Sequence, residues 1–250
     1  MSDNLLPADR PSVKLAAVVT EPRITFTSLY ACVVATLNQI QMPFMSYTSA
    51  FWAKGITCAI EDIIKEFDPE YVLCLDFDTV FTADNVKRLT QHMDENPELA
   101  AVWPVQVSRH EDKPLCFDPN LDYTTTLTKA TFGHFGCTLI RTSALKQLPH
   151  PWFMDLPNPQ TGKWNEEPKS DADITFWRAL KHKGFTCAQA NDVVVGHVEL
   201  AVRWPHSSGV MLQPIQEYRS SGMPVVAEFC PACWQNERVT YGNPTDNGQS

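Results

Sequence analysis

The chain has 250 residues, of which 44% are hydrophobic and 20% charged, a composition typical of a globular protein. Its formal net charge of −9 argues against the clustered Lys and Arg that general nucleic-acid binding requires. No apolar run reaches the roughly 18 residues of a spanning helix, and the N-terminus lacks the features of a signal peptide. We therefore expect a cytoplasmic protein without a transmembrane segment.

In chain order, hydrophobic periodicity predicts alternating strands and helices. We expect a strand at 14–20, helices at about 25–39 and 49–67, a strand at 71–75, a helix capped by Thr82, a strand at 99–107, a loop or hairpin at 108–129, a strand at 131–141, a short helix at 142–148, a loop at 155–170, a helix ended by Gly184, and strands at 185–190 and 192–195. Pro104 places the 99–107 strand at a sheet edge or a bulge. The tail from Arg203 ends in a composition typical of disorder.

The eight cysteines are scattered and indicate no disulfide framework. Most lie inside apolar segments, as reduced buried cysteines do: Cys32, Cys58, Cys74, Cys137 and Cys187. Cys230 and Cys233 have the spacing of half a zinc site, but no second pair is evident, which favours a loose surface pair.

The stretch from Tyr71 to Phe81 carries the strongest chemical signal. A buried strand ends abruptly in Asp76 and Asp78, with Phe77 between them. In an extended backbone alternate side chains share a face, so both carboxylates would point one way and Phe77 back into the core. Two carboxylates this close favour a bound divalent cation, and the carboxyl end of a buried strand is where α/β sheets keep their ligands. The stretch predicts a metal site.

A second candidate is the polar turn between the first strand and the first helix. Thr20, Glu21 and Arg23 lie where such folds seat a nucleotide. The turn has no glycine fingerprint, so neither a dinucleotide fold nor a P-loop is supported.

Two further sets of polar residues lie late in the chain, one at the start of a predicted helix and one after a predicted strand. Asp171 and Asp173 begin a predicted helix. Acidic residues at this position can also have a purely structural role, because they interact favourably with the helix dipole. His197 follows a β-rich run. Repeated βα units would bring all these ends to one edge of a sheet.

Four motifs in this order resemble the GT-A glycosyltransferases, especially their family-2-like branch, over roughly residues 14 to 200. Leu73-Cys-Leu-Asp-Phe-Asp78 resembles the D-x-D strand end, and His134-Phe-Gly-Cys-Thr-Leu-Ile-Arg141 the glycine-containing acceptor-side strand. Asp171-Ala-Asp-Ile-Thr-Phe-Trp177 is similar to the acidic motif that opens a helix, and Val195-Gly-His197 to the late Gly-His motif.

The resemblance implies an α/β fold: one GT-A (Rossmann-like) domain with a mixed, mostly parallel sheet flanked by helices. It would cover residues 13–204, with a nucleotide-binding half at 13–107 and an acceptor half at 108–204. Residues 1–12 would be a flexible lead-in, and 205–250 a partly irregular C-terminal extension.

The resemblance also implies an activity, transfer of a sugar from a nucleotide-diphosphate donor to a hydroxyl acceptor. Mn²⁺ or Mg²⁺ would be held by Asp78 and His197, with Asp76 nearer the ribose. If the reaction inverts, Asp173 would be the general base. The acceptor could be a saccharide, a lipid-linked intermediate, a protein side chain or a modified nucleobase.

The chain departs from the family pattern in two places. Ala172 stands where an acid is usual and the acid lies one place earlier, so the base could be Asp171 or Asp173. Lys54 is the only basic residue in the segment from Ser49 to Gly55, where many relatives carry a basic donor motif. His134 could line the acceptor pocket, although a structural role is favoured.

Two alternatives remain open. Asp76-Phe-Asp-Thr79 also resembles the motif of haloacid-dehalogenase-like phosphatases, in which the first Asp is the nucleophile. Here the motif lies far from the N-terminus and lacks the usual glycine. A non-catalytic protein that binds a nucleotide sugar or a carbohydrate is the other alternative.

Overall fold

The computed structural model describes residues 13–22, 27–108, 113–206 and 209–222. These residues form two compact units, one ending at Val198 and one beginning at Glu199. The predicted boundary at residue 204 falls inside strand β10 (Ala201–His206) of the second unit. The predicted lead-in at 1–12 and the pair Cys230 and Cys233 lie outside the described residues.

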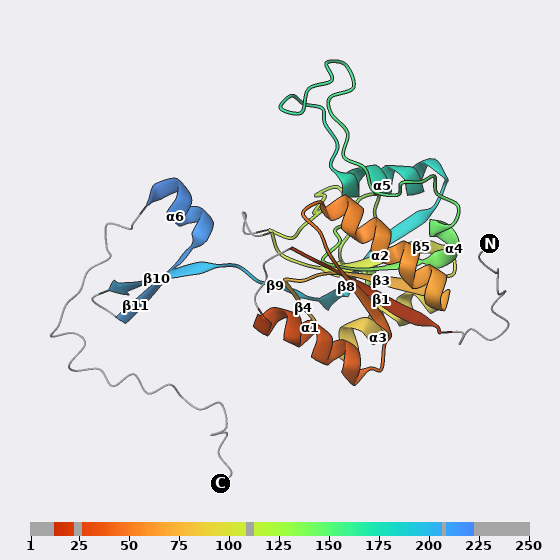
Figure 1. Cartoon of the computed structure of the whole chain (residues 1–250), viewed down its shortest axis with the longest axis horizontal. Helices are drawn as coiled ribbons and strands as arrows, with labels where there is room; N and C mark the ends of the chain where they lie inside the picture. The colour runs from red at the N-terminus through yellow and green to blue at the C-terminus, as the bar shows by residue number, and fades with distance from the viewer. Residues whose placement is uncertain (1–12, 23–26, 109–112, 207–208, 223–250) are drawn as a thin grey trace, which may run out of the picture. The chain divides into compact units, whose positions relative to one another are not determined.

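A seven-stranded sheet forms the centre of the first unit (Figure 1). Its strands are β1 (Leu15–Glu21), β2 (Phe44–Thr48), β3 (Tyr71–Asp76), β5 (Leu99–Val105), β6 (Leu127–Lys129), β7 (Cys137–Arg141) and β8 (Thr186–Val194), in the order β2-β1-β3-β7-β5-β8-β6. Strands β7 and β6 run antiparallel to their neighbours, and the other pairings are parallel. This confirms the predicted α/β class with a mixed, mostly parallel sheet.

Helices cover both faces of the sheet because alternate strand residues point to opposite sides. Val18 and Cys74 pack into one buried cluster with α2 and α5, while Val19 and Leu75 pack into another with α1 and α3 (Figure 1). The helices of this unit are α1 (Thr27–Gln39), α2 (Trp52–Phe67), α3 (Ala83–Glu95), α4 (Thr142–Leu145) and α5 (Ala172–His182). Within the described ranges, none of the helices has the length and apolarity needed to cross a membrane.

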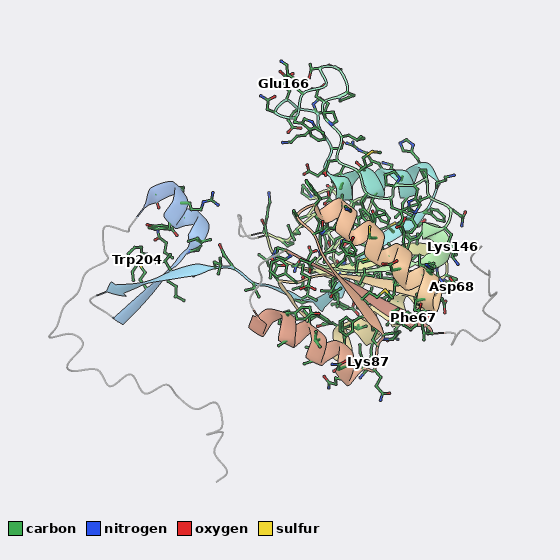
Figure 2. The ribbon with its side chains drawn as sticks, viewed as in Figure 1. Phe67, Asp68, Lys87, Lys146, Glu166 and Trp204 are labelled. Atoms are coloured by element: carbon green, nitrogen blue, oxygen red, sulfur yellow. The ribbon has the colours of Figure 1, made fainter. Side chains whose placement is uncertain are left out.

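The helix ends follow the predicted signals. Thr82 caps α3 by accepting a hydrogen bond from the Asn85 backbone N–H. Helix α2 ends at Asp68, whose backbone is left-handed at φ 42° and whose carboxylate pairs with Lys146 at 2.6 Å (Figure 2). Gly184, at φ +79°, follows α5 in a conformation that favours glycine.

Several sequence expectations for strands are wrong in detail. Strand β5 is central, because it lies between β7 and β8, so Pro104 does not mark an edge. It does mark a bulge, since the β5–β8 register shifts between Pro104 and Val105. Strand β6 lies at the end of the segment 108–129, which was predicted as a loop or hairpin, and the two strands predicted at 185–190 and 192–195 are one strand, β8. Strand β2, which is only partly buried, was not predicted from the hydrophobic pattern.

The predicted strand at 131–141 is shorter in the structure, where β7 begins at Cys137, and the glycines before it pack against side chains. A Cβ on Gly133 would lie 2.5 Å from the ring of Trp103, and one on Gly136 would lie 2.2 Å from Gln106 Oε1. The glycines therefore admit neighbouring side chains, where the sequence suggested a ligand or another backbone. Three predicted core cysteines, Cys74, Cys137 and Cys187, are buried and free.

The second unit contains the hairpin β10–β11 (Gly209–Pro214) and helix α6 (Ile215–Ser221). Trp204 contacts Tyr218 of α6 at a ring-centroid distance of 5.8 Å and donates from Nε1 to Gln213 Oε1 at 2.7 Å. Its Pro- and Ser-rich sequence did not predict these elements, because the packing depends on contacts between chain segments.

A two-stranded pairing next to the sheet joins two predicted motifs. Strand β4 (Thr79–Val80) follows the Asp76 strand, and β9 (Gly196–His197) contains the late histidine; Thr79 is the register partner of His197. The pairing continues as Val198 N–H donates to Asp78 O at 2.9 Å.

Gln106, the residue just after β5, stabilises this pairing through side-chain hydrogen bonds. It is buried, and its Nε2 donates to Gly196 O at 3.2 Å and to Thr79 Oγ1 at 3.3 Å. Gly136 has no side chain, and this leaves space for the Gln106 amide. The Gln106 side chain therefore hydrogen-bonds both strands of the β4–β9 pairing to the end of β5.

We predict that Gln106→Leu weakens the β4–β9 pairing, because leucine fills the space but donates no hydrogen bond. The amide of Val198 should exchange with solvent deuterium roughly five- to tenfold faster, the effect of losing about one hydrogen bond. Gln91→Leu is the control, since Gln91 is exposed on α3 and bonds only to Glu95 along its own helix. Equal exchange rates in the two variants would contradict the role of Gln106.

Candidate active site

Asp76 stands at the carboxyl end of β3 and is held from two neighbouring elements. The parallel β1–β3 register places Thr20 beside it, and Thr20 Oγ1 donates to Asp76 Oδ1 at 2.7 Å. Trp52 Nε1, from the first turn of α2, donates to the same oxygen at 3.0 Å. The Trp52 ring also packs edge-on against Phe135 and Phe153. The carboxylate therefore has a defined position at the edge of the sheet.

Strand β3 ends at Asp76, so the predicted alternation through Asp78 is wrong. The chain turns at Phe77 and Asp78, and the Phe77 backbone N–H donates to Thr20 O at 3.2 Å. Phe77 consequently lines the same pocket as Asp76 and Asp78 and does not point into the core. A strand end followed at once by a tight turn breaks the two-residue period.

Asp78 and His197 face each other across the β4–β9 pairing. Their Oδ2 and Nε2 atoms lie 3.7 Å apart, and Asp78 is only 5% exposed. His197 Nδ1 lies 3.0 Å from Val107 O. A carbonyl oxygen only accepts, so Nδ1 carries the proton, and a neutral His197 has its lone pair on Nε2, toward Asp78. This is the orientation in which histidine binds metals.

A pocket of about 290 Å³ opens at this edge of the sheet. It is lined by residues from β1, β3 and α2 and the turns after them, including Thr20, Glu21, Trp52, Asp76 and Asp78. Among the described lining residues there is no Lys or Arg. The pocket wall is thus acidic. Arg23, the third predicted residue of the first turn, lies outside the described residues.

The described protein groups do not complete a metal site by themselves. In the described part of the chain, no three His, Cys, Asp or Glu side chains gather closely enough to hold an ion. Asp78 and His197 provide one carboxylate and one imidazole, and Asp76 uses Oδ1 to accept from Thr20 and Trp52. An oxygen-preferring divalent ion with one or two protein ligands normally takes the rest from substrate phosphates and water.

The second acidic group lies at the start of α5. Asp171 precedes the helix without a side-chain cap bond, and the cap acceptor is instead Asp155, whose Oδ1 accepts from the Ala172 N–H at 2.9 Å. Asp173 Oδ1 accepts from the Ile174 N–H at 2.7 Å. Burial, together with the charges of Asp171 and Asp155, raises the pKa of Asp173 above its ordinary value.

The segment between Asp155 and α5 is an ordered loop that projects from the body (Figures 1 and 2). Leu156 and Ser170 exchange backbone hydrogen bonds of 2.8 and 3.0 Å at its base. Asn158 is buried inside it, and its Nδ2 donates to Glu167 O at 2.6 Å. The loop closure brings Asp155 next to α5 although seventeen residues separate Asp155 from Ala172.

His134 is a buried structural histidine. It lies 2.8 Å from Pro104 O through Nε2, and as the oxygen only accepts, Nε2 donates. Burial lowers the pKa of His134 to about 4, opposed by this hydrogen bond and assisted by nearby His197. It is therefore neutral near pH 7, and its burial favours the structural role over a place in the acceptor pocket.

The predicted site residues thus form two groups. Thr20, Glu21, Asp76 and Asp78 line one pocket, and His197 faces Asp78. Asp171 and Asp173 are not among the described residues that line it. Three residues with a part in this geometry, Trp52, Gln106 and Asp155, had no sequence signal: an isolated Trp at helical spacing reads as core, and an Asp in a loop reads as solvated.

Comparisons with known proteins identify the fold. No protein-family profile matches the chain, and no curated protein matches it in sequence. Among solved structures, A197 from STIV is similar with a TM-score of 0.55 and 11% identity over 73% of this chain and 85% of that one. The mannosyltransferase PcManGT from Pyrobaculum calidifontis, solved with GDP-Man and Mn²⁺, gives a TM-score of 0.50 and 13% identity over 78% of this chain and 59% of that one.

A third similar structure is GalNAc-T7 with UDP, GalNAc and Mn²⁺, at a TM-score of 0.47 and 9% identity, covering 74% of this chain and 43% of that one. This chain therefore spans about three fifths of the mannosyltransferase and less than half of GalNAc-T7. The first two similarities, together with the sheet order and its mixed direction, show that the chain has a GT-A-like glycosyltransferase fold.

Proposed function

We propose that the protein is a metal-dependent glycosyltransferase that moves a sugar from a nucleotide-diphosphate donor to a hydroxyl acceptor. The observation that carries this proposal is the Asp78–His197 pair, 3.7 Å apart, in which Asp78 lines the same pocket as Thr20, Glu21 and Asp76. The mannosyltransferase of similar fold, solved with GDP-Man and Mn²⁺, supports the donor class.

The donor would occupy the 290 Å³ pocket with its diphosphate toward Asp78. The described lining has acidic but no basic side chains, so it would repel a diphosphate without a cation. Asp78 and His197 would hold Mn²⁺ or Mg²⁺, which when bound neutralises charge on the leaving diphosphate. Asp76, fixed by Thr20 and Trp52, and Glu21 are then positioned to accept hydrogen bonds from ribose hydroxyls.

Asp173 is the general base in this proposal. The acceptor oxygen forms a bond to the anomeric carbon as the bond from that carbon to the diphosphate oxygen breaks, and the diphosphate leaves with the electron pair. The acceptor proton moves to the Asp173 carboxylate. A single displacement of this kind inverts the anomeric configuration. Asp171 is the alternative base, and the raised pKa of Asp173 favours Asp173 because a stronger base takes the proton more readily.

Donor binding is tested by thermal stabilisation. With Mn²⁺, one of UDP, GDP, ADP, CDP or dTDP should raise the melting temperature by several degrees when present at about 100 times its Kd. Asp78→Ala should abolish the shift, because the ion loses the only carboxylate of its two proposed protein ligands. Asp84→Ala is the control, since Asp84 is exposed on α3 and forms an ion pair with Lys87 of the same helix.

The same assay separates the alternatives. Phosphate release from p-nitrophenyl phosphate with no nucleotide-dependent shift would replace the transferase by a phosphatase using Asp76. A metal-dependent shift without sugar transfer to any acceptor would indicate a non-catalytic binding protein.

The general base is tested by pH dependence. Asp173 must be ionised to accept a proton, so kcat/KM should fall as pH drops through its raised pKa. Asp173→Asn should lower kcat by about 10²- to 10⁴-fold. Asp155→Asn keeps an acceptor for the Ala172 N–H but removes a negative charge that raises the pKa of Asp173, so the acid limb should move to lower pH.

Glu166→Gln is the matched control for that shift, because Glu166 is on the same loop but pairs with Lys163. An acid limb that stays in place in Asp155→Asn, or that moves equally in Glu166→Gln, would count against Asp173 as the base.

A further inference from the structure

A second pocket, of about 510 Å³, runs along α5 and is separate from the donor pocket. It lies between α5, the start of β8 and the segment from Cys116 to Phe132. None of the residues that line the donor pocket also lines this one, within the described chain. Its volume is in the range of pockets that bind small molecules. Neither the metal pair nor the donor uses it.

The wall of this pocket combines aromatic rings with a polar rim. Phe132 is 37% exposed, and Trp177 forms part of the buried floor. The Trp177 indole N–H is buried and donates to no acceptor among the described residues, which is uncommon for a buried donor. Lys181, Thr131 and Asp118 add donors and acceptors around these rings.

The charges around the pocket do not select an ion of one sign. Lys129 lies 3.9 Å from Glu98, and Asp118 offsets Lys181. Such a rim suits a ligand that is neutral and carries many hydroxyl groups, since both donors and acceptors are at hand. Aromatic rings below a polar rim suit a ligand with an apolar face and a polar edge. A sugar ring has both properties.

One end of the pocket lies near the proposed base. Cys116 lines the pocket, and the pKa of its thiol is raised by desolvation and, to a lesser degree, by the charge of Asp173, so the two side chains interact electrostatically. Lys181 also lines the pocket, and the rise of an α-helix places its backbone roughly 12 Å along α5 from that of Asp173. An acceptor reacting at Asp173 could thus extend along α5 into the pocket.

We propose that this pocket binds a sugar unit of an oligosaccharide acceptor, remote from the hydroxyl that reacts. The ring would stack on Phe132, and its hydroxyls would bond to Lys181 and Asp118. This inference rests on the proposed glycosyltransferase function and selects saccharides from the possible acceptor classes.

The test measures binding without turnover, on the full chain and without donor. Cellotetraose, maltotetraose and mannotetraose are titrated at millimolar concentration by calorimetry. At least one should bind, and Phe132→Ala should weaken its binding about tenfold, the loss of one stacking contact. Phe117→Ala is the control: Phe117 is a 48% exposed aromatic in the same segment, stacks on Tyr123 and does not line the pocket. The melting temperature of each variant verifies folding.

A second variant and a kinetic readout complete the test. Lys181→Met should weaken binding of the same saccharide, because methionine keeps the aliphatic stem but lacks the hydrogen-bond donor of the ammonium group. In the active enzyme, Phe132→Ala should raise KM for the tetrasaccharide while leaving KM for the nucleotide sugar unchanged. Binding of none of the three saccharides, or equal weakening by Phe117→Ala, would overturn the inference.

These outcomes are distinguishable from failure of the proposed function. Saccharide binding that depends on Phe132, without any Mn²⁺-dependent thermal shift by a nucleotide, would support the saccharide-binding pocket and contradict the proposed glycosyltransferase function. A nucleotide shift that depends on Asp78, with no saccharide binding, would do the reverse.

Discussion

The position of the Asp76 carboxylate depends on a hydrogen-bonded junction between three elements. Thr20 at the end of β1 and Trp52 at the start of α2 both donate to one oxygen of Asp76 at the end of β3. The parallel register of β1 and β3 makes the first contact possible, and the packing of Trp52 against Phe135 and Phe153 orients the second. A charged carboxylate at the rim of an apolar sheet is stabilised by such donors, which also fix its direction.

A second constraint connects the late histidine to the same edge. Strands β4 and β9 are two residues long, and so short a pairing has little stability of its own. Gln106 joins it to β5, and the absence of a side chain at Gly136 gives the amide its space. As a result, Asp78 and His197 come together although more than a hundred residues separate them. The tether is a buried polar side chain whose removal would leave unpaired groups behind.

The two acidic regions of the protein have different electrostatic settings. The wall at Asp76 and Asp78 contains acidic side chains and, among the described residues, no Lys or Arg, a setting that would attract a cation. At α5, burial raises the pKa of Asp173, and the nearby charges of Asp171 and Asp155 raise it further. In the proposed reaction the first region would hold the cation and the second would accept the proton, the two roles that a displacement at an anomeric carbon needs. The uncharged Ala172 lies at the start of α5, and Asp155 from the preceding loop provides a negative charge next to it.

The sequence by itself determined the α/β alternation, most element positions, the strand end at Asp76 and the start of α5 at its aspartates, because hydrophobic period and polarity reversal are local properties. It predicted a turn from Thr20 onward, whereas Thr20 and Glu21 end β1. Only the tertiary structure decided that Phe77 lines the pocket, that Pro104 lies in a central strand, and that Trp52, Gln106 and Asp155 support the site. Those facts depend on turns and on contacts between residues distant in the chain, and no local pattern of residue types encodes which distant partner a side chain will meet.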